Sequence, residues 1–298
     1  MHVLLTGGTG LVGRALCHRL LAQGHKVSVW SRRPEQVRAL CGFEVNGVGR
    51  LEQLAEVPDA VINLAGGSIA DRRWTPERKA QLWASRVTLT ERLVDWMGGL
   101  TTRPSVLISG SAVGWYGDGG EAELTEQSVA SRQYAHTLCD AWEAAARRAS
   151  SHGIRVCLVR TGLVLAHNGG FLQRLIKPFS LGLGGPIGSG RQYMSWIHIQ
   201  DEVGIILHLL NHSECKGVYN ATAPDPVTNR AFSKALGRVF KRPALLPVPG
   251  FALKVALGEM SVLLLTGQRV LPARITEAGY VFRHPTLDAA LDDVINNH

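Results

Sequence analysis

The residues with the clearest chemical potential form a glycine-rich segment near the start of the chain. Residues 6–13 read TGGTGLVG, with the spacing G-x-x-G-x-x-G. In a strand–loop–helix unit, such glycines permit a tight turn, let a pyrophosphate approach the backbone and let the helix pack closely on the sheet. The N-terminus of that helix would also present free N–H groups to the phosphates. The segment predicts a dinucleotide site contacted by Gly7, Thr9, Gly10, Leu11, Val12 and Gly13.

A triphosphate-binding P-loop is the main alternative for the same glycines, because Gly8 and Gly13 also fit G-x-x-x-x-G. The next residues are Arg14 and Ala15. A P-loop requires Lys followed by Ser or Thr, which bind the phosphates and Mg²⁺. Both groups are missing, so the sequence excludes nucleotide triphosphate hydrolysis.

The end of the second apolar run indicates which dinucleotide would bind. An NAD site places Asp or Glu there, to bond the ribose 2′-hydroxyl. Residues 27–35 read VSVWSRRPE, so Ser31, Arg32 and Arg33 stand at that place. Guanidinium groups bind a phosphate through paired hydrogen bonds. The sequence therefore predicts NADP(H), although the two arginines could also merely solvate the start of a helix.

The elements that must position these residues follow from hydrophobic periodicity. Short apolar runs alternate with helical patterns through the first half of the chain, which predicts βαβ units and a parallel sheet. Residues 196–201 read as a strand that enters a helix capped by Asp201. The other expected strands are 2–6, 26–30, 60–66, 105–110 and 154–162, and the expected helices include 11–24, 76–97, 132–151 and one that starts near Thr228.

The pattern of apolar and polar residues changes after Gly162. A glycine-rich loop occupies residues 182–190, and short helices and turns follow from Pro247. The expected fold class is α/β, with a Rossmann-like doubly wound parallel sheet and a smaller C-terminal lobe on the substrate side. The expected domains are an NADP-binding domain over 1–222, in which 171–195 contributes to the substrate side, and the lobe over 223–298.

Composition narrows the class of protein. The chain has 298 residues and a formal net charge of +8, but its basic residues are spread out, which favours anionic small molecules over nucleic acid. Its most apolar region, 251–267, is interrupted by polar residues and is too short to span a membrane. The five cysteines include no C-x-x-C pair, which suits reduced thiols and no metal site. We expect a cytoplasmic protein that binds a small-molecule substrate and neither nucleic acid nor membrane, and a homodimer is left open.

The motifs together resemble one family, the extended short-chain dehydrogenase/reductases, which include sugar-nucleotide epimerases and dehydratases. The likeness is greatest to an atypical branch, the epimerase family proteins of the YfcH type, and it covers essentially the whole chain. The segment PFSLGLGGPIGSGRQ (178–192) is the most specific part of it. The other matching motifs are TGGTGLVG, VINLAG, SRVTLTERLV, LISGSAVGWYGD, WEAAA, RTGLVL, WIHIQD and GQRVLPARITEAGYVF.

This resemblance implies further cofactor contacts. The loop that starts at Asn63 would run under the adenosine and its ribose, and the helix after it would face the cofactor. The stretch from Thr161 to Val164 would lie near the nicotinamide. The residues implied by this comparison are Leu64, Ala65, Gly66, Gln81, Arg86 and Val164.

The resemblance also implies a catalytic set, which this chain has only in part. The ordinary family enzyme uses a Ser or Thr, a Tyr that transfers a proton, and a Lys four residues after the Tyr. Ser111 matches the serine. If Tyr134 is the tyrosine, the lysine position holds Leu138. If Trp142 and Glu143 set the register instead, the two positions hold Ala135 and Cys139.

The missing lysine bears on the direction of the chemistry. Without it a tyrosine has a pKa near 10, so only ~0.1% is phenolate at pH 7, a deficit of roughly 4 kcal/mol for base catalysis. Carbonyl reduction needs only an acid, which a neutral phenol can be. Tyr134 is one candidate, and Tyr116, in a glycine-flanked loop after Ser111, is the other. Tyr134 could equally be a core residue.

Three functions are therefore compared. The first is an NADP(H)-dependent oxidoreductase or epimerase with a non-standard acid/base set, acting on a carbonyl compound or sugar nucleotide. The second is a protein that binds NADPH without turnover, as a sensor or regulator. The third, a nucleic-acid binder, is supported only by net charge. The glycine-rich loop 182–190 and Arg191 favour the first, because a sensor has little use for a substrate-side loop.

Overall fold

The structure is a computed structural model that describes residues 1–167 and 169–296. Its fold is built on a parallel sheet. The seven strands of this sheet are β1 (His2–Thr6), β2 (Lys26–Trp30), β3 (Asn46–Val48), β4 (Ala60–Asn63), β5 (Val106–Ala112), β7 (Arg155–Thr161) and β11 (Gly217–Ala221). Their order is β11-β7-β5-β4-β1-β2-β3, and every neighbouring pair is parallel. The expected Rossmann-like doubly wound sheet is confirmed.

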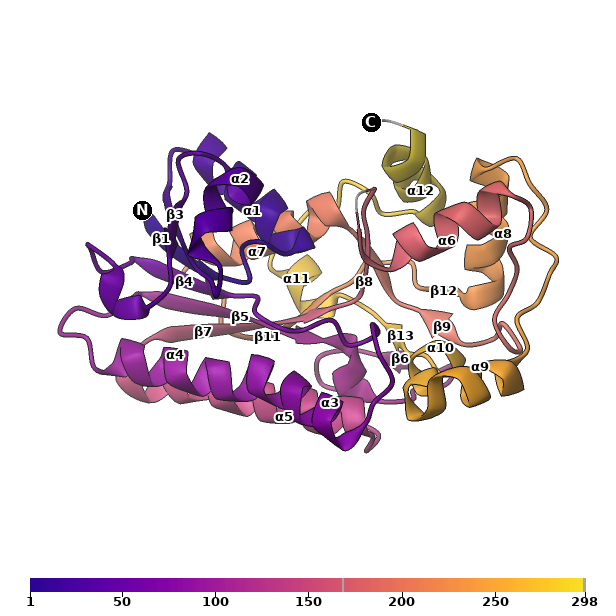
Figure 1. Ribbon diagram of the computed structural model, residues 1–298, viewed down its shortest axis with the longest axis horizontal. Coiled ribbons are helices and arrows are strands. Elements are labelled where there is room, and N and C mark those ends of the chain that lie inside the picture. The colour runs from indigo at the N-terminus through magenta and orange to yellow at the C-terminus, as the bar shows by residue number, and fades with distance from the viewer. Residues whose placement is uncertain (168, 297–298) are drawn as a thin grey trace.

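Helices cover both faces of this sheet (Figure 1). One face carries α1 (Leu11–Ala22), α2 (Val37–Cys41) and α7 (Ile199–Asn211), and the other carries α3 (Pro76–Trp83), α4 (Leu89–Gly98) and α5 (Tyr134–Arg147). Because side chains alternate along a strand, Val3 and Leu5 enter the core on the α1 side and Leu4 the core on the α4 side. Strands buried on both faces explain the unbroken apolar runs in the sequence.

The direction in which strands are added to the sheet reverses between β1 and β4. From β1 the chain adds β2 and β3 on one side, and from β4 it adds β5, β7 and β11 on the other. Ligands of open α/β sheets bind beyond the carboxyl ends of the strands at such a switch point. The segment that follows β1 at this edge is the glycine-rich loop.

The helix expected over 76–97 is interrupted. Residues Ala84–Thr88, between α3 and α4, form a turn of π-helix. A single π turn inside an α-helix re-aims the side chains of that turn and occurs frequently at functional sites. Two strands of the seven-stranded sheet, β3 and β11, were also missed, because at three and five residues they carry little periodic signal.

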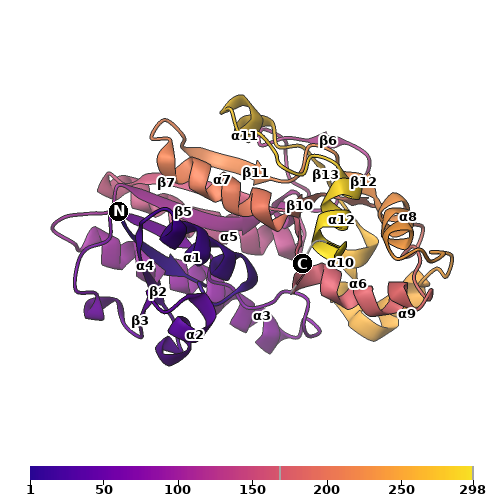
Figure 2. The ribbon, with the colours of Figure 1, turned by 90° about the horizontal axis from the view of Figure 1, so that it is seen from above.

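A second, smaller core joins residues from both sides of residue 222. In this core Leu172 and Trp196 pack with Phe232, Leu236 and Leu291. The elements of this core are β8 (Leu163–Leu165), α6 (Gly170–Ser180), β9 (Tyr193–Met194), β10 (Trp196–His198), β12 (Val227–Thr228), α8 (Asn229–Val239) and α12 (Leu287–Asn296). Together with α9 (Gly250–Leu257) and α10 (Val262–Leu265), they form a lobe that Figure 1 labels and Figure 2 shows grouped at one end of the molecule.

The chain then returns from this lobe to the large sheet. Strand β13 (Arg269–Val270) pairs with β6 (Glu123–Leu124), and α11 (Ala273–Glu277) packs on β11. Ile275 of α11 is fully buried in the core of the sheet. No helix within the described residues is both long and apolar enough to cross a bilayer.

The expected helix cap at Asp201 is wrong. Helix α7 begins earlier, and its N-cap is His198, whose Nδ1 accepts the N–H of Gln200 at 3.1 Å. The Asp201 carboxylate instead accepts the backbone N–H groups of Arg283 and His284, at 2.8 and 3.0 Å. Asp201 therefore ties α7 to the C-terminal segment, a long-range contact that the local sequence pattern does not reveal.

Candidate nucleotide-binding and active site

The glycine-rich loop is shaped by close backbone packing at two of its three glycines. A side chain at Gly7, where φ is +68°, would begin 2.5 Å from the carbonyl oxygen of Leu64. A side chain at Gly13 would begin 2.3 Å from the carbonyl oxygen of Gly7. A side chain at Gly10 would meet only that same oxygen, at 3.2 Å, and otherwise open space. Gly7 and Gly13 are thus required by the fold, whereas Gly10 leaves room beside the backbone for a ligand.

The first turn of α1 fits a phosphate group. Gly10 is the N-cap, and no side chain caps the helix. Leu11 and Val12 follow in the first turn, where backbone N–H groups have no partner within the helix. Thr9, Leu11 and Val12 are half-buried. The uncapped turn and the space at Gly10 are what a bound pyrophosphate requires.

A cavity of about 340 Å³ lies at the end of β2. Ser31 and Arg32 line it, and Arg33 does not, although the Arg33 N–H donates to the Ser31 hydroxyl at 3.1 Å. Arg92 of α4 also lines the cavity, with its guanidinium carbon 5.1 Å from the centre of the Trp30 ring. The sequence did not indicate Arg92, because its position depends on the π turn before α4. The remaining lining residues are Gly49, Ala84, Thr88 and Leu89.

Side-chain hydrogen bonds fix the loop that follows β4. The N–H groups of Leu64 and Ala65 donate to the carbonyl and hydroxyl oxygens of Thr6. The amide group of Asn63 is fully buried and bonds Thr6 and Thr90, so it holds the loop to its neighbours. The loop therefore lies directly beside β1 and the glycine-rich segment.

Two other predicted cofactor residues lie on α3 and the π turn. The Arg86 guanidinium donates through Nη2 to the carbonyl oxygen of Gly67 at 2.8 Å and lies against Gly66. Gln81 is exposed, and its side-chain oxygen accepts from Arg78 at 3.0 Å. Arg86 is thus the one of the pair that contacts the loop after β4.

Strand β8 brings Val164 to the same edge of the sheet. Val164 pairs with Ile197 of β10 and packs against the main core. The Leu11 side chain lies against Gly170, the first residue of α6, and the carbonyl oxygen of Val164 lies 3.5 Å from where a side chain would begin at Gly170. Val164 and the first turn of α1 therefore meet at the start of the smaller lobe.

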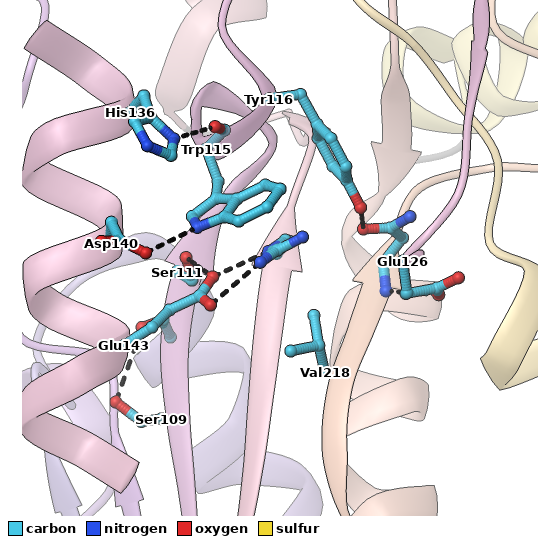
Figure 3. A network of polar contacts seen from close by, with 12 residues as sticks. Ser109, Ser111, Trp115, Tyr116, Glu126, His136, Asp140, Glu143 and Val218 are labelled. Atoms are coloured by element: carbon cyan, nitrogen blue, oxygen red, sulfur yellow. Dashed lines mark hydrogen bonds and ion pairs between the residues drawn. The ribbon is translucent and has the colours of Figure 1, made fainter. Parts of the chain in front are cut away.

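Ser111 belongs to a buried polar network on the α5 side of the sheet (Figure 3). Its hydroxyl donates to Oε1 of Glu143 at 2.7 Å. The fully buried Glu143 also accepts from Nε and Nη2 of Arg160, at 2.7 and 3.0 Å. Ser111 is only 5% exposed. Its catalytic role stays a prediction, and it would require the hydroxyl to leave Glu143.

Tyr116 lies at the other side of this network. Its hydroxyl donates to Oδ1 of Asn220 at 2.8 Å, and the residue is 1% exposed. The Arg160 guanidinium stacks on the Trp115 ring at 3.4 Å. Burial raises the pKa of Tyr116, and the charge of Arg160 opposes this rise. Tyr116 therefore joins β11 to the segment after β5 and does not open onto the cofactor loop.

Tyr134 is the first residue of α5 and is half-buried. Its hydroxyl lies 3.4 Å from the carbonyl oxygen of Lys79, and Trp74 packs edge-on against its ring. Burial raises the pKa of Tyr134, while the nearby charge of Arg86 lowers it. Of the three candidate catalytic residues, Tyr134 is the least buried and the one beside Arg86.

Sequence reasoning missed Glu202, in the first turn of α7. Its carboxyl group is fully buried, and Oε1 accepts the hydroxyl of Thr161 at 2.8 Å. Oε2 has no hydrogen-bond partner in the described part of the chain. Burial raises the pKa of Glu202 to about 8, and the Thr161 bond opposes it. No local pattern distinguishes this residue from an exposed glutamate in a helical first turn.

Replacing Glu202 with Gln should make stability less dependent on pH. In the folded protein Glu202 holds its proton up to about pH 8, whereas in the unfolded chain it ionises near its ordinary pKa. Stability contributed by this group is therefore lost as pH rises from about 4.5 to 8. We expect the Glu202→Gln variant to gain roughly 2–4 kcal/mol relative to the unmodified protein between pH 5 and pH 8.

Urea unfolding at several pH values measures this gain. The exposed Glu121 provides a matched control, and Glu121→Gln should show no such trend. Parallel curves for Glu202→Gln and the unmodified protein would contradict the assignment of a neutral buried acid.

Among the described residues, one group of side chains could hold a metal ion. The ligand atoms of His198, His284 and Asp293 lie within 4.8 Å of one another. Nε2 of His198 is 3.1 Å from Asp293, and the two imidazole rings stack at 3.7 Å. A histidine–aspartate contact and ring stacking account for this arrangement, so it carries no assignment of a metal.

Fold and loop together define a nucleotide-binding α/β protein of the extended short-chain dehydrogenase/reductase class. The chain belongs to the NAD dependent epimerase/dehydratase family, whose model matches residues 3–222. A second model, the domain of unknown function DUF1731, matches residues 248–294. The family resemblance that was expected from the sequence motifs is confirmed.

Relatives span the whole chain. It is 39% identical to the Arabidopsis thaliana protein "Epimerase family protein SDR39U1 homolog, chloroplastic", over 98% of this chain and 86% of that one. It is 41% identical to "Epimerase family protein MT2273" of Mycobacterium tuberculosis, over 97% and 96% of the two chains. A crystal structure of human epimerase family protein SDR39U1 (isoform 2) with NADPH superposes with a TM-score of 0.89 at 34% identity, covering 100% of both chains.

Proposed function

We propose that this protein is an NADP(H)-dependent oxidoreductase that reduces a carbonyl group of a small molecule. The observation that carries this proposal is the cavity at the end of β2, where Ser31 and Arg32 stand in place of the acid of an NAD site. The uncapped first turn of α1, which follows the neighbouring strand β1, fits a pyrophosphate. The presence of NADPH in the human SDR39U1 structure supports the same cofactor.

In this proposal the residues of the chain bind the cofactor and supply one proton. NADPH, when bound, supplies a hydride to the carbonyl carbon. Tyr134, protonated because burial raises its pKa, donates its phenolic proton to the carbonyl oxygen, and the product is an alcohol. The phenolate that remains takes a proton from water before the next turnover. The lysine that would favour the reverse reaction is absent from α5.

Cofactor preference tests the assignment of the β2 cavity. Arg32→Asp should weaken NADPH binding by ~10–100-fold, because it removes a charge-assisted hydrogen bond and adds a repelled carboxylate. Arg33→Asp should have a smaller effect, since Arg33 does not line the cavity. Fluorescence titration of the unmodified protein and both variants with NADPH and NADH measures these affinities. Equal affinity of the unmodified protein for the two cofactors would contradict the assignment.

A second function, NADPH binding without turnover, is favoured by a specific observation. Where a lysine is expected, α5 presents either Leu138 or Cys139, and both are buried. A sensor or regulator needs the cofactor site but not the acid. Following NADPH absorbance against a panel of aldehydes, ketones and sugar nucleotides separates the two functions. Tight NADPH binding with no reduction of any carbonyl would favour the sensor.

A further inference from the structure

We propose that Arg86 supplies the cation that α5 lacks at the expected lysine position and that its guanidinium binds the ribose next to the nicotinamide. This inference rests on the proposed function, because it assigns a partner to a residue of the same site. It concerns a positively charged group that lies between the loop after β4 and the start of α5. Three features of the molecule support this assignment: the absence of a cation at the lysine position of α5, the placement of Arg86, and the absence of an acidic partner for Arg86 among the described residues.

The first feature is that α5 provides no cation at either candidate lysine position. In one register the lysine position is Leu138, which is fully buried among apolar side chains. In the other register it is Cys139, which is 4% exposed. Burial raises the pKa of Cys139 to about 12, so its thiol is neutral. Neither side chain can bind a ribose hydroxyl as a lysine does.

The second feature is that the π turn directs the Arg86 side chain toward this part of α5. The Arg86 guanidinium carbon lies 5.4 Å from the centre of the Trp142 ring, on the next turn of α5 after Cys139. Nη2 donates to the carbonyl oxygen of Gly67 at 2.8 Å. The charge of Arg86 acts on both Cys139 and Tyr134. An uninterrupted α-helix would rotate Arg86 away from this direction, because the π turn adds one residue.

The third feature is that Arg86 has no acidic partner in the part of the chain that the structure describes. Around Tyr134, Arg78 is paired with Asp71 at 2.7 Å and Lys79 with Glu259 at 2.6 Å. No carboxylate within residues 1–167 and 169–296 pairs with Arg86. A half-buried guanidinium without a counter-charge has lost hydrogen bonds to water that the protein replaces only in part. The oxygen atoms of a bound ligand would replace the rest. The guanidinium has five N–H donors, and the described residues supply two hydrogen-bond acceptors for them, the Ser85 hydroxyl and the Gly67 carbonyl oxygen.

The test compares ligands that share only one half of the cofactor. Full-length Arg86→Gln should bind NADPH ~10–100-fold more weakly than the unmodified protein, the size of a lost charge-assisted hydrogen bond. Its affinity for 2′,5′-ADP, which carries the adenosine half, should change by less than about twofold. Arg86→Lys should retain most of the NADPH affinity. Arg148 is the exposed C-cap residue of α5 and pairs with Asp95, so Arg148→Gln is the charge-matched control and should bind both ligands normally.

A second readout does not depend on turnover. Ultraviolet titration of the phenol, with Tyr134→Phe subtracted, should show the pKa of Tyr134 rising in Arg86→Gln, because the charge that lowers it is removed, and staying near the unmodified value in Arg86→Lys. The double variant Arg86→Gln/Cys139→Lys should regain NADPH affinity, because it returns a cation to α5.

These results keep the two proposals apart. Two outcomes would show that Arg86 only holds Gly67 in place. One is that binding of NADPH and binding of 2′,5′-ADP weaken equally. The other is that neither affinity changes and the pKa of Tyr134 stays the same. If the Arg86 results hold and no carbonyl is reduced, the oxidoreductase proposal fails while the assignment of Arg86 stands.

Discussion

Tyr134→Phe should lower the rate of NADPH-dependent carbonyl reduction by ~10²–10⁴-fold, the usual contribution of a positioned general acid. The phenylalanine keeps the packing against Trp74 and removes only the hydroxyl, so the protein should stay folded. NADPH affinity should change little. The measurement is kcat and KM on a carbonyl substrate found by absorbance screening, with thermal unfolding of the variant as the check on its fold.

The pH profile gives an independent check on the same residue. Activity of the unmodified protein should stay level through neutral pH and fall only as pH approaches the pKa of Tyr134, which burial raises above its ordinary value. The direction is fixed because the proton donor is the neutral phenol, which is lost at high pH. A rate that instead rises with pH would indicate that a base limits the reaction.

Ser111→Ala and Tyr116→Phe are the comparison variants for Tyr134→Phe. Ser111 bonds Glu143 and Tyr116 bonds Asn220, so each variant leaves a buried acceptor with one donor fewer. Each should cost about 1–3 kcal/mol of stability and leave the rate of the folded protein close to normal. A ~10²-fold loss of rate in Ser111→Ala would mean that its hydroxyl leaves Glu143 and binds the substrate oxygen.

Gly10→Val should abolish measurable cofactor binding while the protein remains folded. The backbone at Gly10 is extended, at φ −76° and ψ 177°, which valine adopts readily. The added side chain would fill the open space beside the loop, where the pyrophosphate must approach. We expect the loss to exceed ~10²-fold in NADPH affinity, because both phosphates would be displaced from the first turn of α1.

Gly13→Ala is the control that distinguishes an effect on folding from an effect on ligand binding. Its methyl group would begin 2.3 Å from the carbonyl oxygen of Gly7 and 2.6 Å from Cα of Gly8, so α1 would have to move off the sheet. Gly13→Ala should therefore lower the free energy of unfolding, whereas Gly10→Val should not. Normal NADPH binding by a well-folded Gly10→Val variant would show that the phosphates bind elsewhere.

Local signals in the sequence were sufficient for the large-scale architecture and for the strand–loop–helix context of the glycine-rich loop. Apolar runs that alternate with helical periodicity predicted the parallel doubly wound sheet, because strands covered on both faces must be apolar throughout. The glycine spacing of residues 6–13 and the arginines after Trp30 could be read because their structural context, a strand, a loop and a helix start, is continuous in the chain. The short strands β3 and β11 carried no comparable signal.

Tertiary contacts determined which polar side chains are free to act. Ser111 and Tyr116 look alike as candidates in the sequence, yet their partners Glu143 and Asn220 lie 32 and 104 residues further along the chain. Arg86 faces α5 only because of a π turn, whose single extra residue leaves no periodic trace. Glu202 becomes a neutral acid because the surrounding core removes water from it. Each of these outcomes depends on groups that are distant in sequence, and the pairing of such groups is set by packing rather than by local pattern.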